Sequence, residues 1–344
     1  MGLCLLGFGN VGRRFTQILV DRADQLADVH GVRFAVHAVG TRSHGSLLAP
    51  EGVDPAELLR RSDGPASFRL PDPARTGIEL IERSQAEVLV EATVAEGTGA
   101  PVATKHVETA LAHSMDVVTV NKGPIAWHFR RLADLAAAQG RQLRYEGVTM
   151  DGVPVYNVAE FCLPGATITG FRGVLNATSN YVLERLADGI SMEQAVAQAQ
   201  VEGFAEADPH HDLAGHDGAA KVAALANVLL DARITPDDVP RCSIEAVTAE
   251  QVASVRGRGL RLRVVCQARS TGGLVTAGMD LAEVSPDDPL FAVGATASMV
   301  ALTTDLAGTV EITQRGGGLT ATAYAVLSDL LTLYGRRRGG DTRR

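Results

Sequence analysis

A glycine-rich segment near the start of the chain constrains the fold more than any other feature. Residues 7–12 read GFGNVG, which satisfies the pattern G-x-G-x-x-G. A short apolar run, residues 3–6, comes before it, and apolar residues then recur at helical spacing. A glycine-rich turn between a strand and a helix suits the pyrophosphate of a dinucleotide, because the backbone can approach closely and the helix N-terminus offers free N–H groups. The residues expected at such a site are Gly7, Phe8, Gly9, Asn10, Val11 and Gly12.

The pattern that follows supports this interpretation over a chance glycine-rich turn. Segments rich in apolar and β-branched residues lie at 32–39, 87–93 and 116–121, with helical patterns at 106–113 and 124–139. Strands that alternate with helices predict a parallel, doubly wound sheet. The predicted fold class is therefore α/β, with a Rossmann-type dinucleotide-binding domain in residues 1–145.

The pattern changes after residue 152. Strands without regular crossover helices are predicted at residues 168–175, 260–267 and 274–281. Ser191 and Gln194 fit a capping box that opens a helix ending near Glu202, and a second helix is predicted over 217–230. We assign residues 146–315 to an α+β substrate domain and group a C-terminal helix, about residues 316–335, with the first domain. The arginine- and glycine-rich residues 336–344 are expected to form a flexible tail.

Composition limits the partners of this chain. Its net charge of −8 and pI near 5.6 argue against a nucleic-acid or anionic-membrane partner. The four cysteines have no paired spacing, which favours a reducing compartment. The longest charge-free apolar stretch, residues 289–304, is shorter than the ~20 residues of a membrane span, and no signal-peptide pattern opens the chain. We expect a soluble, cytoplasmic protein.

Asp217 and Lys221 are a candidate pair for proton transfer. They are four residues apart at the start of a predicted helix, so both project from one face. A surface ion pair is the simpler interpretation of such spacing. Here, however, the helix is otherwise apolar, and a partly desolvated lysine has a pKa below its usual value of ~10.4, which suits proton transfer.

An acidic loop, residues 206–212, precedes that helix. Its carboxylates could form an anionic pocket for a substrate ammonium group, or they could simply be solvated. A metal site built from His210, His211 and His216 is a weaker interpretation, because their spacing matches no familiar zinc motif. Lys122 follows a predicted parallel strand, where ligands bind in open α/β sheets, although an exposed lysine in a turn fits equally well.

The residues after the second predicted strand bear on the choice of nicotinamide cofactor. NAD-selective domains usually place an acid there to bond the ribose 2′-hydroxyl, but this chain has none between Asp28 and Glu51. Arg42 offers a charged fork and Ser43 a hydroxyl to a 2′-phosphate. We predict that NADP(H) is favoured over NAD(H). If Arg42 points to solvent, both cofactors would serve.

Several longer segments resemble the homoserine dehydrogenase family over nearly the whole chain. Residues 173–181, GVLNATSNY, are similar to its G-V-L-N-G-T-T-N-Y segment. Residues 203–209 with Asp212, Gly215, Asp217 and Lys221 follow its long signature G-y-A-E-x-D-P-x-x-D-x-x-G-x-D-x-x-x-K. Residues 117–122 resemble V-V-T-A-N-K, and residues 316–323 resemble a G-A-G…T-A segment that returns toward the cofactor.

The resemblance implies an oxidoreductase that interconverts aspartate semialdehyde and homoserine by hydride transfer, in amino-acid biosynthesis, as a homodimer. Lys221 would donate the proton, with Lys122 close by and Asp217 orienting the centre. The resemblance further assigns residues to three ligands. The substrate would contact Glu206, Asp212, Ala177 and Thr178. The cofactor would contact Thr93, Lys122 and Gly318 besides the residues given above. A monovalent cation such as Na⁺ would be held by Glu146 together with carbonyls of Thr149, Asp151 and Val153.

The chain departs from the family pattern at several positions. Asp151 adds a carboxylate to the cation loop, and Ala177 replaces a usual glycine, which would narrow the substrate pocket. Gln314 and Arg315 stand where Gly-Pro is common. Because the chain ends about ten residues after the last predicted helix, we expect a short form without a C-terminal regulatory domain and without feedback by threonine through one.

Three other functions compete with this interpretation. A related dehydrogenase for another small semialdehyde would share all of these residues. An aspartate-semialdehyde dehydrogenase would need a nucleophilic cysteine, and no cysteine here has a suitable context. A non-catalytic NAD(P)-binding sensor would not need to keep five candidate proton-transfer and substrate groups together.

Overall fold

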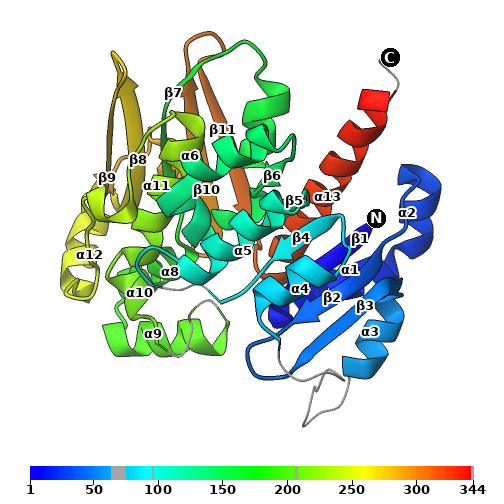
Figure 1. Ribbon diagram of the computed structural model, residues 1–344. Coiled ribbons are helices and arrows are strands. Elements are labelled where there is room, and N and C mark those ends of the chain that lie inside the picture. The colour runs from blue at the N-terminus through cyan, green and yellow to red at the C-terminus, as the bar shows by residue number, and fades with distance from the viewer. Residues whose placement is uncertain (63–74, 95–96, 204, 206–207, 342–344) are drawn as a thin grey trace. The chain divides into compact units, whose positions relative to one another are not determined.

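The computed structural model describes residues 1–62, 75–94, 97–203, 205 and 208–341. The chain forms two compact units (Figure 1). The first contains Met1–Gly152 and Gly318–Arg344, and the second contains Val153–Gly317. The predicted α/β class with a Rossmann-type sheet is confirmed.

The first unit is built on a six-stranded sheet of order β3-β2-β1-β4-β5-β6. Its strands are β1 Gly2–Leu6, β2 Ala35–Gly40, β3 Ser46–Val53, β4 Val88–Glu91, β5 Asp116–Thr119 and β6 Leu143–Arg144. All neighbours pair in parallel except β2 and β3, which are antiparallel. Because the strand order reverses between β1 and β4, the carboxyl ends of these two strands form the switch point at which doubly wound sheets bind ligands.

Helices cover both faces of this sheet. They are α1 Asn10–Asp21, α2 Ala23–His30, α3 Pro55–Ser62, α4 Gly77–Arg83, α5 Pro101–Ala112, α6 Lys122–Ala138, α13 Leu319–Asp341 and the 3₁₀ turn η1 Glu146–Val148. Alternate residues of β1 point to opposite faces. Leu3 and Leu5 join a core with α1, α3 and α13, whereas Cys4 and Leu6 join one with α4, α5 and α6. The C-terminal helix therefore completes one face of the N-terminal sheet.

Helix α13 is longer than the sequence predicted, and residues 336–341 are helical rather than a flexible tail. The guanidinium of Arg337 donates to Asp116 Oδ2 at 2.7 Å and to Glu87 Oε2 at 2.5 Å. Within the same helix, Asp329 accepts the backbone N–H of Glu146 at 2.9 Å. These bonds to residues distant in sequence hold the end of the helix on the first unit. Of the helices described, none has the length and apolar character needed to cross a bilayer.

The second unit contains an antiparallel five-stranded sheet of order β11-β10-β7-β8-β9. Its strands are β7 Ile168–Val174, β8 Arg261–Thr271, β9 Leu274–Val284, β10 Ala297–Thr304 and β11 Thr309–Arg315. Its helices and short helical turns are α7 Val155–Asn157, η2 Val158–Cys162, α8 Ala177–Ala187, α9 Met192–Val201, α10 His210–Leu213, α11 His216–Leu229, η3 Pro236–Asp238, α12 Ala249–Gly257 and η4 Pro289–Ala292. The predicted capping box of Ser191 and Gln194 is present at the start of α9.

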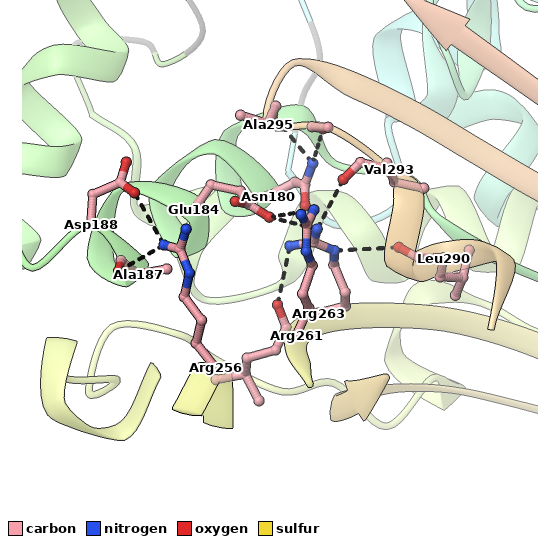
Figure 2. A network of polar contacts seen from close by, with 12 residues as sticks. Asn180, Glu184, Ala187, Asp188, Arg256, Arg261, Arg263, Leu290, Val293 and Ala295 are labelled. Atoms are coloured by element: carbon pink, nitrogen blue, oxygen red, sulfur yellow. Dashed lines mark hydrogen bonds and ion pairs between the residues drawn. The ribbon is translucent and has the colours of Figure 1, made fainter. Parts of the chain in front are cut away.

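A buried arginine ties α8 to the loop before β10 (Figure 2). Arg263 of β8 is 1% exposed, and its guanidinium contacts Glu184 of α8 at 2.6 Å and donates to the carbonyl of Val293 at 2.9 Å. Asn180, one turn before Glu184, donates to the carbonyls of Gly294 and Ala295. Helix α8, whose first turn carries candidate site residues, is thereby fixed along its length.

Candidate active site

The glycine-rich turn of the first unit has no room for side chains at two of its three glycines. Gly7 has φ +90°, and a Cβ there would collide with the carbonyl oxygen of Ala92. A Cβ at Gly12 would collide with the carbonyl oxygen of Gly7. A Cβ at Gly9 would meet no atom within 4 Å, and Gly9 precedes α1 without a side-chain cap. This geometry fits the backbone cradle of a dinucleotide pyrophosphate.

The turn after β4 lies against the glycine-rich turn and carries Thr93. The backbone N–H and the hydroxyl of Thr93 both donate to Oε1 of Glu91, which is fully buried. Asn121 donates from Nδ2 to the carbonyl of Thr93 at 3.3 Å and caps α6 through the N–H of Gly123. Lys122 is the first residue of α6. The carboxyl ends of β4 and β5 therefore bring the predicted positions 93 and 122 together.

Sequence reasoning did not assign Glu91 a role. The sequence feature that could have indicated a role is an acidic residue at the last position of β4, a strand that is otherwise apolar and buried at all its positions. His106 of α5 lies beside it, with Nδ1 at 3.5 Å from Oε1. Glu91, with His106 beside it, holds the turn after β4 through the two hydrogen bonds that it accepts from Thr93.

Arg42 and Ser43 follow β2, at the same edge of the sheet. Both side chains are exposed, and Ser43 Oγ lies 2.9 Å from Nδ1 of His44. The turn is closed by Thr41, whose hydroxyl accepts the N–H of His44 and donates to the carbonyl of Gly45. An exposed Arg42 at the end of β2 is in the position where a ribose 2′-substituent is read in this type of sheet.

The residues predicted to hold a cation lie in the segment between β6 and α7. Asp151 Oδ2 accepts the N–H of Gly318 at 2.6 Å, and Oδ1 accepts the hydroxyl of Thr322 at 3.2 Å, so this carboxylate caps α13. The same bond occupies the Gly318 N–H expected near the cofactor. Glu146 and Thr149 are buried in the first unit, whereas Val153 begins the second. Within the described ranges, no three His, Cys, Asp or Glu side chains are grouped as metal ligands.

The second unit holds a compact cluster around Lys221. Its ammonium group lies 2.9 Å from Asp217 Oδ2 and donates to the carbonyl of Leu175 at 2.9 Å. The side chains of Lys221 and Asp217 are only 17% and 11% exposed. The sequence interpretation considered desolvation alone, but the neighbouring carboxylate favours the ammonium form, which is the form a proton donor needs.

Asp212 belongs to the same cluster, linked through a residue that sequence reasoning quoted without giving it a role. Asn176 donates from Nδ2 to both Asp212 and Asp217 at 2.8 Å. Ser179 adds a hydroxyl bond to the carbonyl of Asp212 at 3.1 Å. Ala177 and Thr178 form the first turn of α8, directly after Asn176. Glu206 lies outside the described residues.

A buried cysteine lies near this cluster. Cys266 of β8 is fully buried near Lys221, and burial raises the pKa of its thiol to about 12. Beyond the cluster, the rings of His211 and His216 pack edge to face, and His210 Nδ1 lies 2.8 Å from Glu245. Burial lowers the pKa of His216, and the positive charge of Arg241 adds to the effect. Among the described residues of the acidic loop, Asp212 shares a hydrogen-bond donor, the amide of Asn176, with the lysine-bound Asp217.

A sheet of order 3-2-1-4-5-6 with a glycine-rich turn after β1 is typical of dinucleotide-binding domains, and the first unit belongs to this class. Two family models match the chain. The model for the homoserine dehydrogenase NAD-binding domain covers residues 7–146, and that for homoserine dehydrogenase covers residues 154–331. The chain therefore belongs to the homoserine dehydrogenase family.

Relatives and solved structures agree with this assignment over nearly the full chain. The NAD(+)-dependent homoserine dehydrogenase of Pseudomonas canavaninivorans is 36% identical, with 96% of each chain covered. The homoserine dehydrogenase of Methanocaldococcus jannaschii is 32% identical, with 97% of this chain and 98% of the relative covered. A crystal structure of a putative homoserine dehydrogenase from Archaeoglobus fulgidus superposes with a TM-score of 0.86 at 29% identity, covering 97% of this chain and 99% of that chain.

Proposed function

We propose that this protein catalyses the interconversion of L-aspartate 4-semialdehyde and L-homoserine with a nicotinamide cofactor. The observation that carries the proposal is the cluster of Lys221, Asp217, Asn176 and Asp212, which combines a proton donor with carboxylates for an amino-acid substrate. Membership in the homoserine dehydrogenase family supports the same activity.

Lys221 is proposed as the general acid. When bound, the nicotinamide supplies the hydride that reduces the aldehyde carbon, or accepts it in the reverse direction. Lys221 gives a proton to the aldehyde oxygen as negative charge develops there, and takes it back from the hydroxyl in the reverse reaction. Asp217 keeps the ammonium charged and oriented, since its carboxylate lies 2.9 Å away. Lys122 is proposed to act beside Lys221.

Asp212 and Glu206 are proposed to bind the ammonium group of the substrate, with Ala177 and Thr178 against its other end. A carboxylate that bonds a substrate ammonium makes a charge-assisted hydrogen bond, stronger than a neutral one. Asp212 supports this role, since in the part of the chain that the structure describes no lysine or arginine forms an ion pair with it.

Gly7, Gly9 and Gly12 are proposed to cradle the cofactor pyrophosphate, while Thr93 contacts the cofactor nearby. For the ribose we propose a preference for NADPH, read by Arg42 and Ser43. A relative 36% identical is named as NAD(+)-dependent, so the preference must be measured separately from the activity. We further propose that the protein acts as a homodimer in the cytoplasm and that Glu146, with carbonyls of Thr149, Asp151 and Val153, holds a Na⁺ ion.

Steady-state oxidation of NADPH and NADH in the presence of aspartate semialdehyde tests the proposal directly. Turnover with aspartate semialdehyde well above that with other small semialdehydes is expected. Faster turnover with another aldehyde would mean that this aldehyde is the substrate and that it is reduced by the same hydride transfer. Cofactor binding without turnover of any semialdehyde would refute the enzymatic proposal in favour of a sensor.

A further inference from the structure

Asn176 occupies the junction between β7 and α8 in the second unit, and its side chain is almost completely buried. It is 6% exposed and precedes the first turn of α8. Oδ1 accepts the backbone N–H of Ser179 at 2.7 Å, which makes Asn176 the N-cap of the helix.

The amide nitrogen of the same side chain has a second use. Nδ2 donates to Asp212 Oδ1 and to Asp217 Oδ2, each at 2.8 Å. All three hydrogen bonds fix the orientation of the amide, since a backbone N–H can only donate and ionised carboxylates can only accept. Both donor hydrogens are therefore committed to the two carboxylates.

Capping alone does not explain an asparagine at this position. Asparagine, aspartate and serine cap helices about equally well, because each supplies an acceptor oxygen. Only asparagine, among these three, also offers two N–H donors to the other side. The amide nitrogen, which capping does not use, is the group that bonds Asp212 and Asp217.

The two acids have different surroundings. Two oxygens bonded to one nitrogen lie within the roughly 4–6 Å over which neighbouring charges influence each other. Asp217 is compensated by Lys221 at 2.9 Å, whereas among the described side chains Asp212 is bonded by the neutral amide of Asn176. Without the shared amide, Asp212 and Asp217 would compete for Lys221.

We infer that Asn176 is a positioning residue that keeps the two carboxylates in separate roles, holding Asp217 for Lys221 and leaving Asp212 for the substrate ammonium. This inference rests on the proposed function and adds to it the residue that keeps the roles of Asp212 and Asp217 separate.

Three substitutions separate capping from positioning. Asn176→Ser keeps a capping oxygen and loses the two donors, Asn176→Asp keeps the cap and adds a third carboxylate, and Asn176→Ala loses both functions. Asn180→Ser is the matched control, because Asn180 is a buried asparagine of the same helix whose Nδ2 donates to the carbonyls of Gly294 and Ala295 instead. Thermal unfolding, kcat, KM and the pH dependence of kcat are measured for each.

Asn176→Ser is expected to unfold within a few degrees of the parent but to lose about 10- to 100-fold in kcat/KM for aspartate semialdehyde, in line with the loss of hydrogen bonds to charged groups. In Asn176→Asp the added negative charge favours the ammonium of Lys221, so the basic limb of the kcat profile moves to higher pH. Asn180→Ser is expected to lower the unfolding temperature and to leave that limb in place.

A readout without turnover keeps this inference distinct from the proposed function. In crystal structures of the two proteins, the carboxylate of Asp212 is expected to leave its position beside Asp217 in Asn176→Ser, since the amide that bonds both carboxylates in the parent is gone. A parent that reduces no semialdehyde but shows this shift would refute the proposed activity and uphold the positioning by Asn176. An active parent, with unchanged carboxylate positions and unchanged kcat/KM in Asn176→Ser, would overturn the inference alone.

Discussion

Replacing Glu184 by glutamine is predicted to destabilise the second unit, because Arg263 would then be a buried charge without its counter-ion. Arg263 is 1% exposed, and burial lowers the pKa of its guanidinium while Glu184 at 2.6 Å opposes this (Figure 2). Removing one partner of a buried ion pair costs about 3–5 kcal/mol. The side chain of Glu184 is 19% exposed, and Arg263 keeps its bond to the carbonyl of Val293. We therefore expect about 3 kcal/mol, at the lower end of that range.

The neighbouring pair of Asp188 and Arg256 provides a control in the same network. These side chains are 43% and 59% exposed and lie 3.2 Å apart. Exposed ion pairs contribute about 0–1 kcal/mol, so Asp188→Asn should cost less than about 1 kcal/mol. Glu184→Gln and Asp188→Asn each remove one negative charge from the same segment of chain. They differ in the arginine that loses its partner, because Arg263 is buried and Arg256 is exposed.

Equilibrium unfolding in urea, followed by circular dichroism and by fluorescence, measures both effects. The single tryptophan, Trp127, lies in α6 of the first unit, so its fluorescence reports that unit while circular dichroism also reports the helices of the second. Arg263→Met with and without Glu184→Gln completes a double-mutant cycle, in which we expect a coupling of about 1–3 kcal/mol. A loss in Glu184→Gln no larger than in Asp188→Asn would refute the reasoning.

Three further predictions concern the proposed chemistry. Lys221→Ala should lower kcat by about 10²–10⁴ with little change in cofactor affinity, because it removes the general acid; near-normal kcat in a steady-state assay would exclude that role. Asp212→Asn and Glu206→Gln should each weaken substrate binding by about 1.5–3 kcal/mol through loss of a charge-assisted bond, and unchanged KM values in both would mean that the loop is merely solvated. Arg42→Ala should reduce kcat/KM for NADPH more than for NADH; a parent that prefers NADH, or an equal loss with both cofactors, would show that Arg42 does not read a 2′-phosphate.

The sequence predicted those features whose cause is local. The glycine-rich turn, with its flanking strand and helix, is specified within the first 21 residues, and the capping box of Ser191 and Gln194 spans four. Strand β2 was predicted from residue 32 and begins at Ala35, an error of the size expected at element ends. The predicted positions around Lys221 are likewise grouped, because Asp212, Asp217 and Lys221 are close in sequence.

Features that depend on distant partners could not be predicted from the sequence. The length of α13 depends on Arg337 reaching Asp116 and Glu87, more than 200 residues earlier. The carboxylate of Asp151 accepts the N–H of Gly318, 167 residues away, a partner that the sequence around Asp151 does not indicate. Asn176 has a local capping role that hides its bonds to acids 36 and 41 residues further on. Strand β10 was missed because a short apolar run fits a strand and a buried helix equally well.

The return of α13 to the first unit also affects how this protein must be made. During synthesis the six strands of the N-terminal sheet leave the ribosome long before residues 319–341 do, while the second unit is still being translated. Until then the surface around Phe15 and Leu19, which α13 covers through Ala323, Val326 and Leu330, remains open to water. Exposed apolar surface of this kind makes a nascent chain prone to aggregation. The first unit to begin translation is thus the last whose core can be completed, because that core waits for the residues of α13.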